Sequence, residues 1–111
     1  MKPENFSFGD GISINEFVYI NATGGVVFGN NVILSSGVKI LSTGLVYGEP
    51  PYKYASSRIL IGDNVQIGAA AIVLPGVSIV DNVIVGAGSI VTKDLTEPGV
   101  YIGSPAKIIR K

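Results

Sequence analysis

Residues 61–96 carry a regular repeat, which reads IGDNVQ, IGAAAI, VLPGVS, IVDNVI, VGAGSI and VTKDLT. An aliphatic residue opens every six-residue block, and a second small or aliphatic residue follows four positions later. This period differs from the 3.6 residues of an amphipathic helix and from the two residues of a half-buried strand. It indicates a short strand followed by a sharp bend, so that three blocks close one coil and successive coils stack.

The bends of these coils are also visible in the sequence. Residues 63–64, 75–76 and 81–82 are Asp-Asn, Pro-Gly and Asp-Asn, and they fall in the middle of their blocks. Asn, Asp and Gly tolerate the backbone angles that a tight bend requires. Neighbouring coils would lie roughly 4.8 Å apart and pair through parallel strands, with the opening aliphatic residues pointing inward. The sequence therefore predicts an all-β protein with the fold of a parallel β-helix.

The same frame extends toward the N-terminus with one interruption. Six blocks fit residues 10–45 and seven fit residues 55–96, which makes a little over four coils of three blocks each. The nine residues between them, 46–54, read VYGEPPYKY, and we expect a protruding loop there because prolines disrupt a strand ladder. We expect residues 1–9 to form a polar lead-in and residues 97–111 a C-terminal tail, within a single domain that spans residues 1–111.

The composition excludes several classes of function. The 111 residues contain no cysteine and no histidine, which rules out disulfides, a thiolate nucleophile, a Ser-His-Asp triad and a metal ligated by His or Cys. The formal net charge is zero, which argues against nucleic acid or an anionic membrane as a partner. No apolar stretch is long enough to span a bilayer, and the start MKPENFSFGD lacks the apolar run of a signal peptide, so we expect a cytoplasmic protein.

The low charge content bears on assembly. Only 14% of the residues are charged, whereas a typical soluble domain carries roughly 25%. A column of so few coils buries little surface by itself, and flat outer faces that are short of charges favour contact with other protein surfaces. We therefore expect identical columns to pack side by side, most simply as a ring of three.

Two segments near the C-terminus are more specific than the repeat. GAGSIVTKD at residues 86–94 and GSPAKIIR at residues 103–110 resemble the hexapeptide-repeat acyltransferases, and most of all the sugar O-acetyltransferases of the maltose, galactoside and nodulation-factor type. The resemblance implies a left-handed parallel β-helix, a homotrimer, and acetyl-CoA bound in a cleft between adjacent subunits. It also implies an enzyme that moves an acetyl group from acetyl-CoA to a hydroxyl of a sugar or related acceptor.

The resemblance further implies which positions contact acetyl-CoA, namely Ala69, Ala87, Thr92, Lys93, Lys107 and Arg110. The two alanines would line the pantetheine arm through their backbone, and the threonine and the first lysine would lie near the nucleotide end. The two cations of the tail would reach the CoA phosphates, because ammonium and guanidinium groups bind phosphate oxygens. From the residues alone, the alanines are also typical of plain turns and the cations of solvated surface charges.

Two further positions concern the acceptor and the chemistry. Asn21 matches a family asparagine that helps bind the acceptor, although it is equally typical of a turn beside two glycines. The resemblance also implies a histidine as general base in a Thr-Gly-His context, whereas residues 43–45 read Thr-Gly-Leu, and the chain has no other histidine to replace Leu45. A sugar hydroxyl must lose its proton as it attacks a thioester, and a positioned base accelerates such a step typically by about 10²–10⁴-fold.

Three interpretations of the missing histidine stay open. The expected loop could supply another base, for which Glu49 is its only carboxylate, while Tyr47, Tyr52 and Tyr54 could contact a sugar ring. The acceptor could instead be the amine of an amino sugar, since a neutral amine attacks without first losing a proton. The protein could also be a catalytically inactive trimer that binds CoA or acts only as a scaffold.

Overall fold

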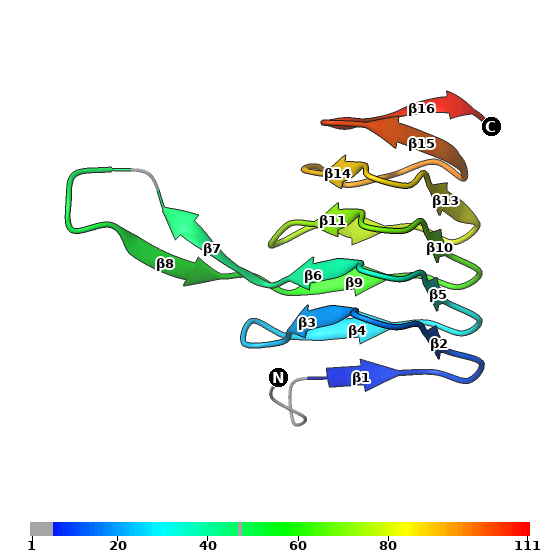
Figure 1. The fold of residues 1–111 in the computed structure, drawn as a ribbon, viewed down its shortest axis with the longest axis horizontal. Coiled ribbons are helices and arrows are strands. Elements are labelled where there is room, and N and C mark those ends of the chain that lie inside the picture. Colours follow the sequence, from blue (N-terminus) through cyan, green and yellow to red (C-terminus); the bar gives the residue numbers. More distant parts are fainter. Residues whose placement is uncertain (1–5, 47) are drawn as a thin grey trace.

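The computed structural model describes residues 6–46 and 48–111, and over these ranges the chain forms strands and turns without a helix. Most of the strands belong to three parallel sheets, which make the three sides of a column (Figure 1). The chain visits the three sheets in turn and rises by one coil after every third strand. In the described part of the chain there is consequently no helical segment with the length and apolar character needed to cross a membrane.

Each sheet stacks one strand from every coil. The first sheet contains β1 (Phe6–Phe8), β4 (Val26–Phe28), β9 (Ile59–Ile61) and β12 (Ser78–Ile79). The second contains β2 (Ser13–Ile14), β5 (Ile33–Leu34), β10 (Gln66–Ile67), β13 (Val83–Val85) and β15 (Gly99–Gly103), and β16 (Ala106–Arg110) pairs antiparallel with its last strand. The third contains β3 (Tyr19–Asn21), β6 (Lys39–Leu41), β11 (Ile72–Val73) and β14 (Ile90–Val91).

The coil count agrees with the sequence. Strands β1–β3, β4–β6, β9–β11 and β12–β14 each complete one turn around the column. A bridge between Ile79 and Leu95, followed by β15, begins another turn. This arrangement confirms the predicted all-β, parallel β-helix of a little over four coils.

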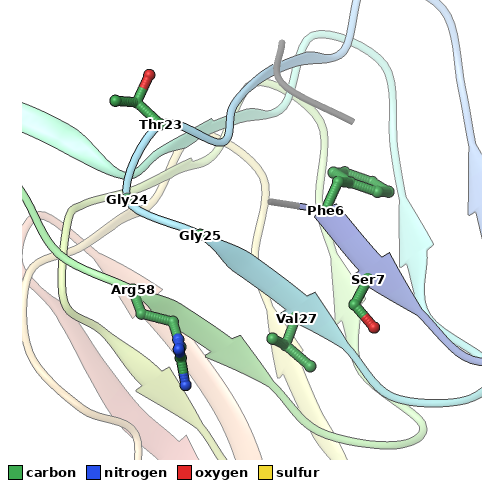
Figure 2. Close-up of a pocket in the computed structure, with 7 residues that line it drawn as sticks. All are labelled: Phe6, Ser7, Thr23, Gly24, Gly25, Val27 and Arg58. Atoms are coloured by element: carbon green, nitrogen blue, oxygen red, sulfur yellow. The ribbon is translucent and has the colours of Figure 1, made fainter. Parts of the chain in front are cut away.

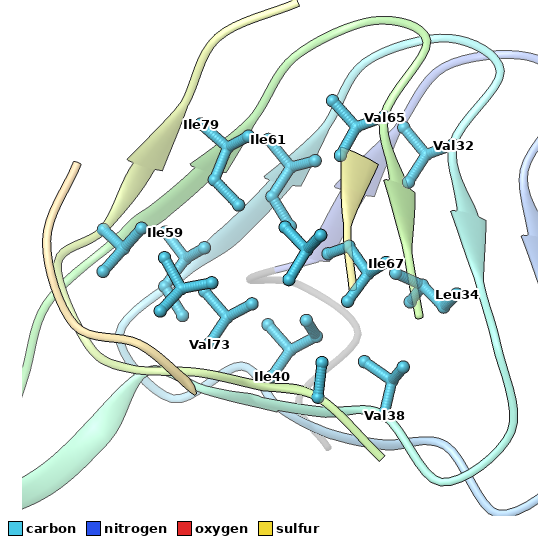
Figure 3. Close-up of a cluster of buried hydrophobic side chains, with 14 of the residues drawn as sticks. Val32, Leu34, Val38, Ile40, Ile59, Ile61, Val65, Ile67, Val73 and Ile79 are labelled. Carbon is cyan, nitrogen blue, oxygen red and sulfur yellow. The ribbon is translucent and has the colours of Figure 1, made fainter. Parts of the chain in front are cut away.

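The repeat positions form the core of the column. All opening and second residues of the six blocks in residues 61–96 are at most 4% exposed. Equivalent positions stack from coil to coil, as Ile67 does with Leu34 below it and Val85 above it (Figure 3). Outward positions between them stay exposed, as Leu60 and Ile84 show. Because each buried aliphatic side chain stabilises the fold by roughly 1.5–3 kcal/mol, these stacks hold the coils together.

The bends between the first and second sheets, which we call the first corner, are tied to one another. At each bend a backbone N–H donates to the side chain of the equivalent residue one coil above. Asp10 donates to Oδ1 of Asn30 at 2.8 Å, and Asn30 donates to Oδ1 of Asp63 at 2.8 Å. Asp63 in turn donates to Oδ1 of Asp81 at 2.7 Å. The residue after the aspartate is left-handed, as in Asn64 with φ of 56°, a conformation that asparagine adopts readily. The Asp-Asn pairs of the repeat therefore build bends, as expected.

The column begins earlier than the repeat indicated. Residues 6–8, which the sequence places in a polar lead-in, form β1 and pair in parallel with β4. The ring of Phe6 lies 5.1 Å from that of Phe8 and 5.4 Å from that of Phe28, between centroids. The two phenylalanines of β1 thus cover the N-terminal end of the core. They were missed because Ser7 and the polar residues around them mask a strand of only three residues.

The excursion from the column is longer than the nine residues expected. The chain leaves the third sheet after Ser42 and returns to the column at Ser57, and the stretch between forms a hairpin of β7 (Thr43–Val46) and β8 (Lys53–Ser56). Gly44 and Ala55, which the six-residue frame places in coils, pair with each other across this hairpin. The hairpin projects away from the column (Figure 1). Antiparallel pairing satisfies backbone groups that a bare loop would leave to water.

Candidate functional site

The root of the hairpin is fixed by a buried serine. Ser42 is fully buried, and its hydroxyl donates to the backbone oxygen of Asn21 at 2.6 Å and accepts from the N–H of Gly24 at 2.9 Å. The N–H of Ser57 donates to the backbone oxygen of Ser42 at 2.8 Å, so the two ends of the excursion meet. A Cβ on Gly24 would lie 2.8 Å from the nitrogen of Ser57, which is why only glycine fits beneath this junction.

Asn21 takes part in the same junction. Its Oδ1 accepts from the backbone N–H of Thr23 at 3.1 Å and from the hydroxyl of Thr43 at 3.3 Å. The Thr43 hydroxyl also lies 2.8 Å from that of Ser56, across the hairpin. These bonds orient β7 and β8 relative to the column. They account for Asn21 as a structural residue, and its expected role toward an acceptor stays a prediction.

Above the hairpin root lies a groove of about 460 Å³, which we call the upper groove. Its walls are the hairpin on one side and the bends between the third and first sheets, the third corner, on the other. The lining residues are Gly44, Leu45, Val46, Ala55, Ser57, Leu74, Pro75 and Thr92. The fold thus brings Leu45, at the expected position of the general base, and Thr92, an expected acetyl-CoA contact, to one cavity.

Below the hairpin root lies a second groove of about 340 Å³, which we call the lower groove. It runs over the outer surface of the first sheet, and Figure 2 shows its residues, from Phe6 and Ser7 to Arg58. Ser57 lines the upper groove and the next residue, Arg58, lines the lower one. The two grooves therefore flank the point where the chain re-enters the column.

The two expected pantetheine contacts stack at the second corner, between the second and third sheets. Ala69 and Ala87 are both exposed, and the backbone oxygen of Ala69 accepts from the N–H of Gly88 at 2.8 Å. A Cβ on Gly68 would lie 2.6 Å from the nitrogen of Ala87, so the chain needs glycine there for the coils to approach. The result is a narrow ridge of small, exposed residues.

The expected phosphate contacts lie at the C-terminal end of the column. In the β15–β16 pair, Lys107 lies opposite Ile102 and Arg110 opposite Val100. Val100 and Ile102 are two residues apart on one strand and share a face. A register shift between Val100 and Tyr101 adds one residue to β16, so that Lys107 and Arg110, three residues apart, come to lie opposite that face. Lys93 is exposed beside Thr92 at the third corner. In one chain, the expected donor contacts are thus divided among the second corner, the third corner and the C-terminal strand β16.

No carboxylate among the described residues of the hairpin lines the upper groove. Glu49 lies in the connection between the two hairpin strands, exposed and away from the lining residues. Tyr52 is 55% exposed, and Tyr54 pairs across the hairpin with Leu45 and is 75% exposed. Tyr47 lies outside the described residues. Residues 6–46 and 48–111 hold no group of three acidic, His or Cys side chains suited to a metal ion.

Sequence reasoning missed several residues that shape these grooves. Ser42 and Ser57 are ordinary polar residues in the sequence, and nothing marks them as neighbours across a 15-residue separation. Pro75 was seen only as a bend residue, although it forms part of the upper groove. Arg58 is marked in the sequence, because it is the only cation between Lys53 and Lys93.

The comparisons with known proteins agree with this geometry. A family model described as the hexapeptide repeat of succinyl-transferase matches residues 58–93. The galactoside O-acetyltransferase of Escherichia coli K12 is 37% identical over 118 residues, an alignment that covers 98% of this chain and 58% of that protein. The chain therefore carries the hexapeptide repeat of these acyltransferases and is similar to a sugar O-acetyltransferase over almost its whole length. It spans about half the length of the curated relatives it matches.

Solved structures of family members share the fold. A hexapeptide-repeat acetyltransferase from Vibrio cholerae, complexed with acetyl coenzyme A, has a TM-score of 0.89 at 23% identity and covers 96% of this chain and 60% of its own. A maltose O-acetyltransferase from Clostridium difficile 630 has a TM-score of 0.70 at 29% identity and covers 96% of this chain and 66% of its own. The first of these likenesses concerns the fold alone.

The Ser42 junction gives a test of how the hairpin is held. We expect Ser42→Ala to lower the free energy of unfolding by about 1–3 kcal/mol, because it leaves the Gly24 N–H without its partner. The exposed Ser36 provides the matched control, and Ser36→Ala should change stability by less than about 0.5 kcal/mol. Urea unfolding followed by circular dichroism measures both. Equal losses in the two variants would contradict the assignment.

Proposed function

We propose that this protein transfers an acetyl group from acetyl-CoA to a hydroxyl of a sugar or related acceptor. The observation that carries the proposal is the upper groove, in which Leu45 and Thr92 face one cavity beside the hairpin. The 37% identity to a galactoside O-acetyltransferase supports the same reaction. A groove of about 460 Å³ lies in the range of small-molecule sites, roughly 300–1,000 Å³.

The donor half of the proposal rests on the second corner and the C-terminal strands. The backbone of Ala69 and Ala87 offers an extended ridge against which an amide-containing pantetheine arm can hydrogen-bond. Lys107 and Arg110 share one face of β16 and present two cations for the CoA phosphates. The Vibrio cholerae relative was solved with acetyl coenzyme A, which fits this assignment.

The chemical step needs few groups from the protein. The acceptor oxygen forms a bond to the thioester carbonyl carbon and the carbon–sulfur bond breaks. The proton of the acceptor hydroxyl ends on the sulfur, so that CoA leaves as the thiol. Leu45 cannot take that proton, and the described lining of the upper groove offers only the hydroxyls of Ser57 and Thr92 as polar side chains. Such a site supplies proximity and orientation, which alone can lower a barrier substantially.

An amino-sugar acceptor is the second candidate, and the same lining favours it. A neutral amine is nucleophilic before it loses a proton, so a groove without a titratable base suffices for N-acylation. The two candidates differ only in the acceptor atom that attacks the thioester. A CoA-binding trimer without turnover is the third possibility, and thiol release distinguishes it from both.

We also propose that three copies assemble, with the donor cleft between neighbours. The projecting hairpin is a two-stranded ribbon, which is marginally stable by itself, and it exposes Leu45, Val46, Tyr52 and Tyr54. The proposed donor contacts of one chain are spread over two corners and β16, so a neighbour would complete the cleft. Sedimentation at micromolar concentration should give three times the chain mass of 11.5 kDa. A monomer mass would contradict the trimer.

The donor assignment predicts a specific binding defect. Isothermal titration should show acetyl-CoA binding to the full chain, and Lys107→Gln with Arg110→Gln should raise the Kd by about 10-fold or more, because two charge-assisted contacts are lost. Lys39→Gln, which removes an exposed charge from the outer face of β6, should leave the Kd unchanged. Release of free thiol with sugars or amino sugars then tests turnover. Absence of heat and of thermal stabilisation at millimolar acetyl-CoA would refute the enzyme proposal.

Leu45 allows a direct test of the missing base. We expect Leu45→His to raise thiol release with a hydroxyl acceptor by at least about 10-fold, since a positioned base contributes typically 10²–10⁴-fold. Leu45→Gln is the matched control, because it adds polarity at similar size without a base at neutral pH. With an amino-sugar acceptor the histidine should have little effect. An unchanged rate with every hydroxyl acceptor would show that the acceptor does not approach Leu45.

A further inference from the structure

The lower groove contains one charged residue among those that line it. It is lined by Phe6, Ser7, the turn of residues 23–25, Val27 and Arg58, and Arg58 is the only ionisable residue among them. Val27 pairs with Ser7 in β1 and with Leu60 in β9, so Ser7, Val27 and Leu60 share the outer face of the first sheet. Figure 2 shows Arg58, Val27 and Ser7 on the same side of the ribbon. The groove is therefore a mostly uncharged surface with one guanidinium at its edge.

The fold directs Arg58 into this groove. Arg58 precedes the buried Ile59, so alternation along the strand turns its side chain outward. Cγ and Nε of Arg58 lie 3.7 Å from the position that a Cβ of Gly25 would occupy. The missing side chain at Gly25 leaves a slot, and the arginine stem lies along it toward the N-terminal coils. This placement follows from the repeat and from one glycine, and it does not depend on an ion pair.

Arg58 also lacks an acidic partner among the residues that the structure describes. Over residues 6–46 and 48–111, the ion pair that the structure contains joins Lys111 and Glu97 near the C-terminus. Asp63 accepts a backbone N–H at the first corner, at the opposite end of the first sheet. Asp94, at the third corner two coils above, accepts the backbone N–H of Ser78 at 2.8 Å. No described acidic residue therefore occupies the donors of the guanidinium, which can bind a ligand.

We propose that the lower groove binds an anionic group of the acyl acceptor, held by the Arg58 guanidinium, and that the acceptor is therefore an acidic sugar. This inference rests on the proposed acyl transfer and specifies its substrate class. The adjacent residues Ser57 and Arg58 line the two grooves, so an acceptor anchored at Arg58 lies beside the hairpin root that borders the upper groove. Its hydroxyl or amine is thereby directed toward the donor side.

The ligand chemistry follows from the guanidinium. Its planar fork of N–H donors matches the paired oxygens of a carboxylate or a phosphate, and such contacts are stronger than those to neutral oxygens. The apolar walls formed by Phe6 and Val27 reduce competition from water and strengthen the contact. A neutral hexose offers only hydroxyls and would leave this charge without its partner. A carboxylate and a phosphate share the required chemistry, and the test separates them.

The test measures binding and turnover with matched sugars. D-glucose, D-glucuronate and glucose 6-phosphate are titrated into the full chain, and binding is followed by NMR. We expect at least one acidic sugar to bind about 10-fold or more tightly than glucose. Arg58→Gln should raise the Kd of the acidic sugar by about 10- to 100-fold, and it should leave the Kd values of glucose and acetyl-CoA unchanged. Arg58→Lys should retain part of the preference for the acidic sugar over glucose, and Lys39→Gln should retain all of this preference.

The outcomes distinguish this inference from the proposed reaction. If neither acidic sugar binds more tightly than glucose, or if Arg58→Gln and Lys39→Gln act alike, the Arg58 site is wrong, even when thiol release with neutral sugars shows that acyl transfer occurs. If an acidic sugar binds through Arg58 but no thiol is released with any acceptor, the anion site stands and the transfer reaction fails. If Arg58→Gln weakens the binding of glucuronate, the anionic group is a carboxylate. If it weakens the binding of glucose 6-phosphate, the group is a phosphate.

Discussion

The whole molecule depends on the close stacking of short aliphatic strands inside a narrow three-sided column. Each coil contributes a few side chains, almost all Val, Ile, Leu or Ala, and strand pairing stacks equivalent residues of neighbouring coils, as it does Ile67 and Val85. Parallel pairing fixes the register, because a slip by one residue would turn each buried side chain outward. The corners are bound by the same constraint. A Cβ on Gly68 would lie 2.6 Å from Ala87, so neighbouring bends approach closely enough to become continuous ridges.

The single interruption of this stacking creates the functional surface. Strand pairing stops at Ser42 and resumes after Ser57, and the intervening residues satisfy their own backbone as a hairpin. Because the two ends meet through one hydrogen bond, the column continues almost undisturbed beneath the hairpin. The grooves above and below the root are the direct result. One contains the position where relatives of this type are expected to hold a base, and the other contains Arg58.

The proposed donor contacts do not involve Leu45, which occupies the expected position of the base. The ridge of Ala69 and Ala87 and the cations of β16 depend only on the column and its last strands. They are independent of the residue that stands on β7. The proposed donor contacts can therefore be retained while the residues that bind the acceptor change. The proposed acidic acceptor fits this division, since a charge contact at Arg58 can orient a substrate without a base.

The sequence by itself determined the β-helix, its coil number and the bends, because a six-residue period of buried aliphatics admits few other folds. The resemblance also predicted where donor contacts and the missing histidine fall. Only the tertiary structure decided that residues 6–8 join the column and that Phe6 packs against its core, since a three-residue strand has no period of its own. It also decided that Leu45 and Thr92 line one groove and that Arg58 lies over Gly25. Those contacts join residues that are distant in the chain, and they depend on how the hairpin leaves the column.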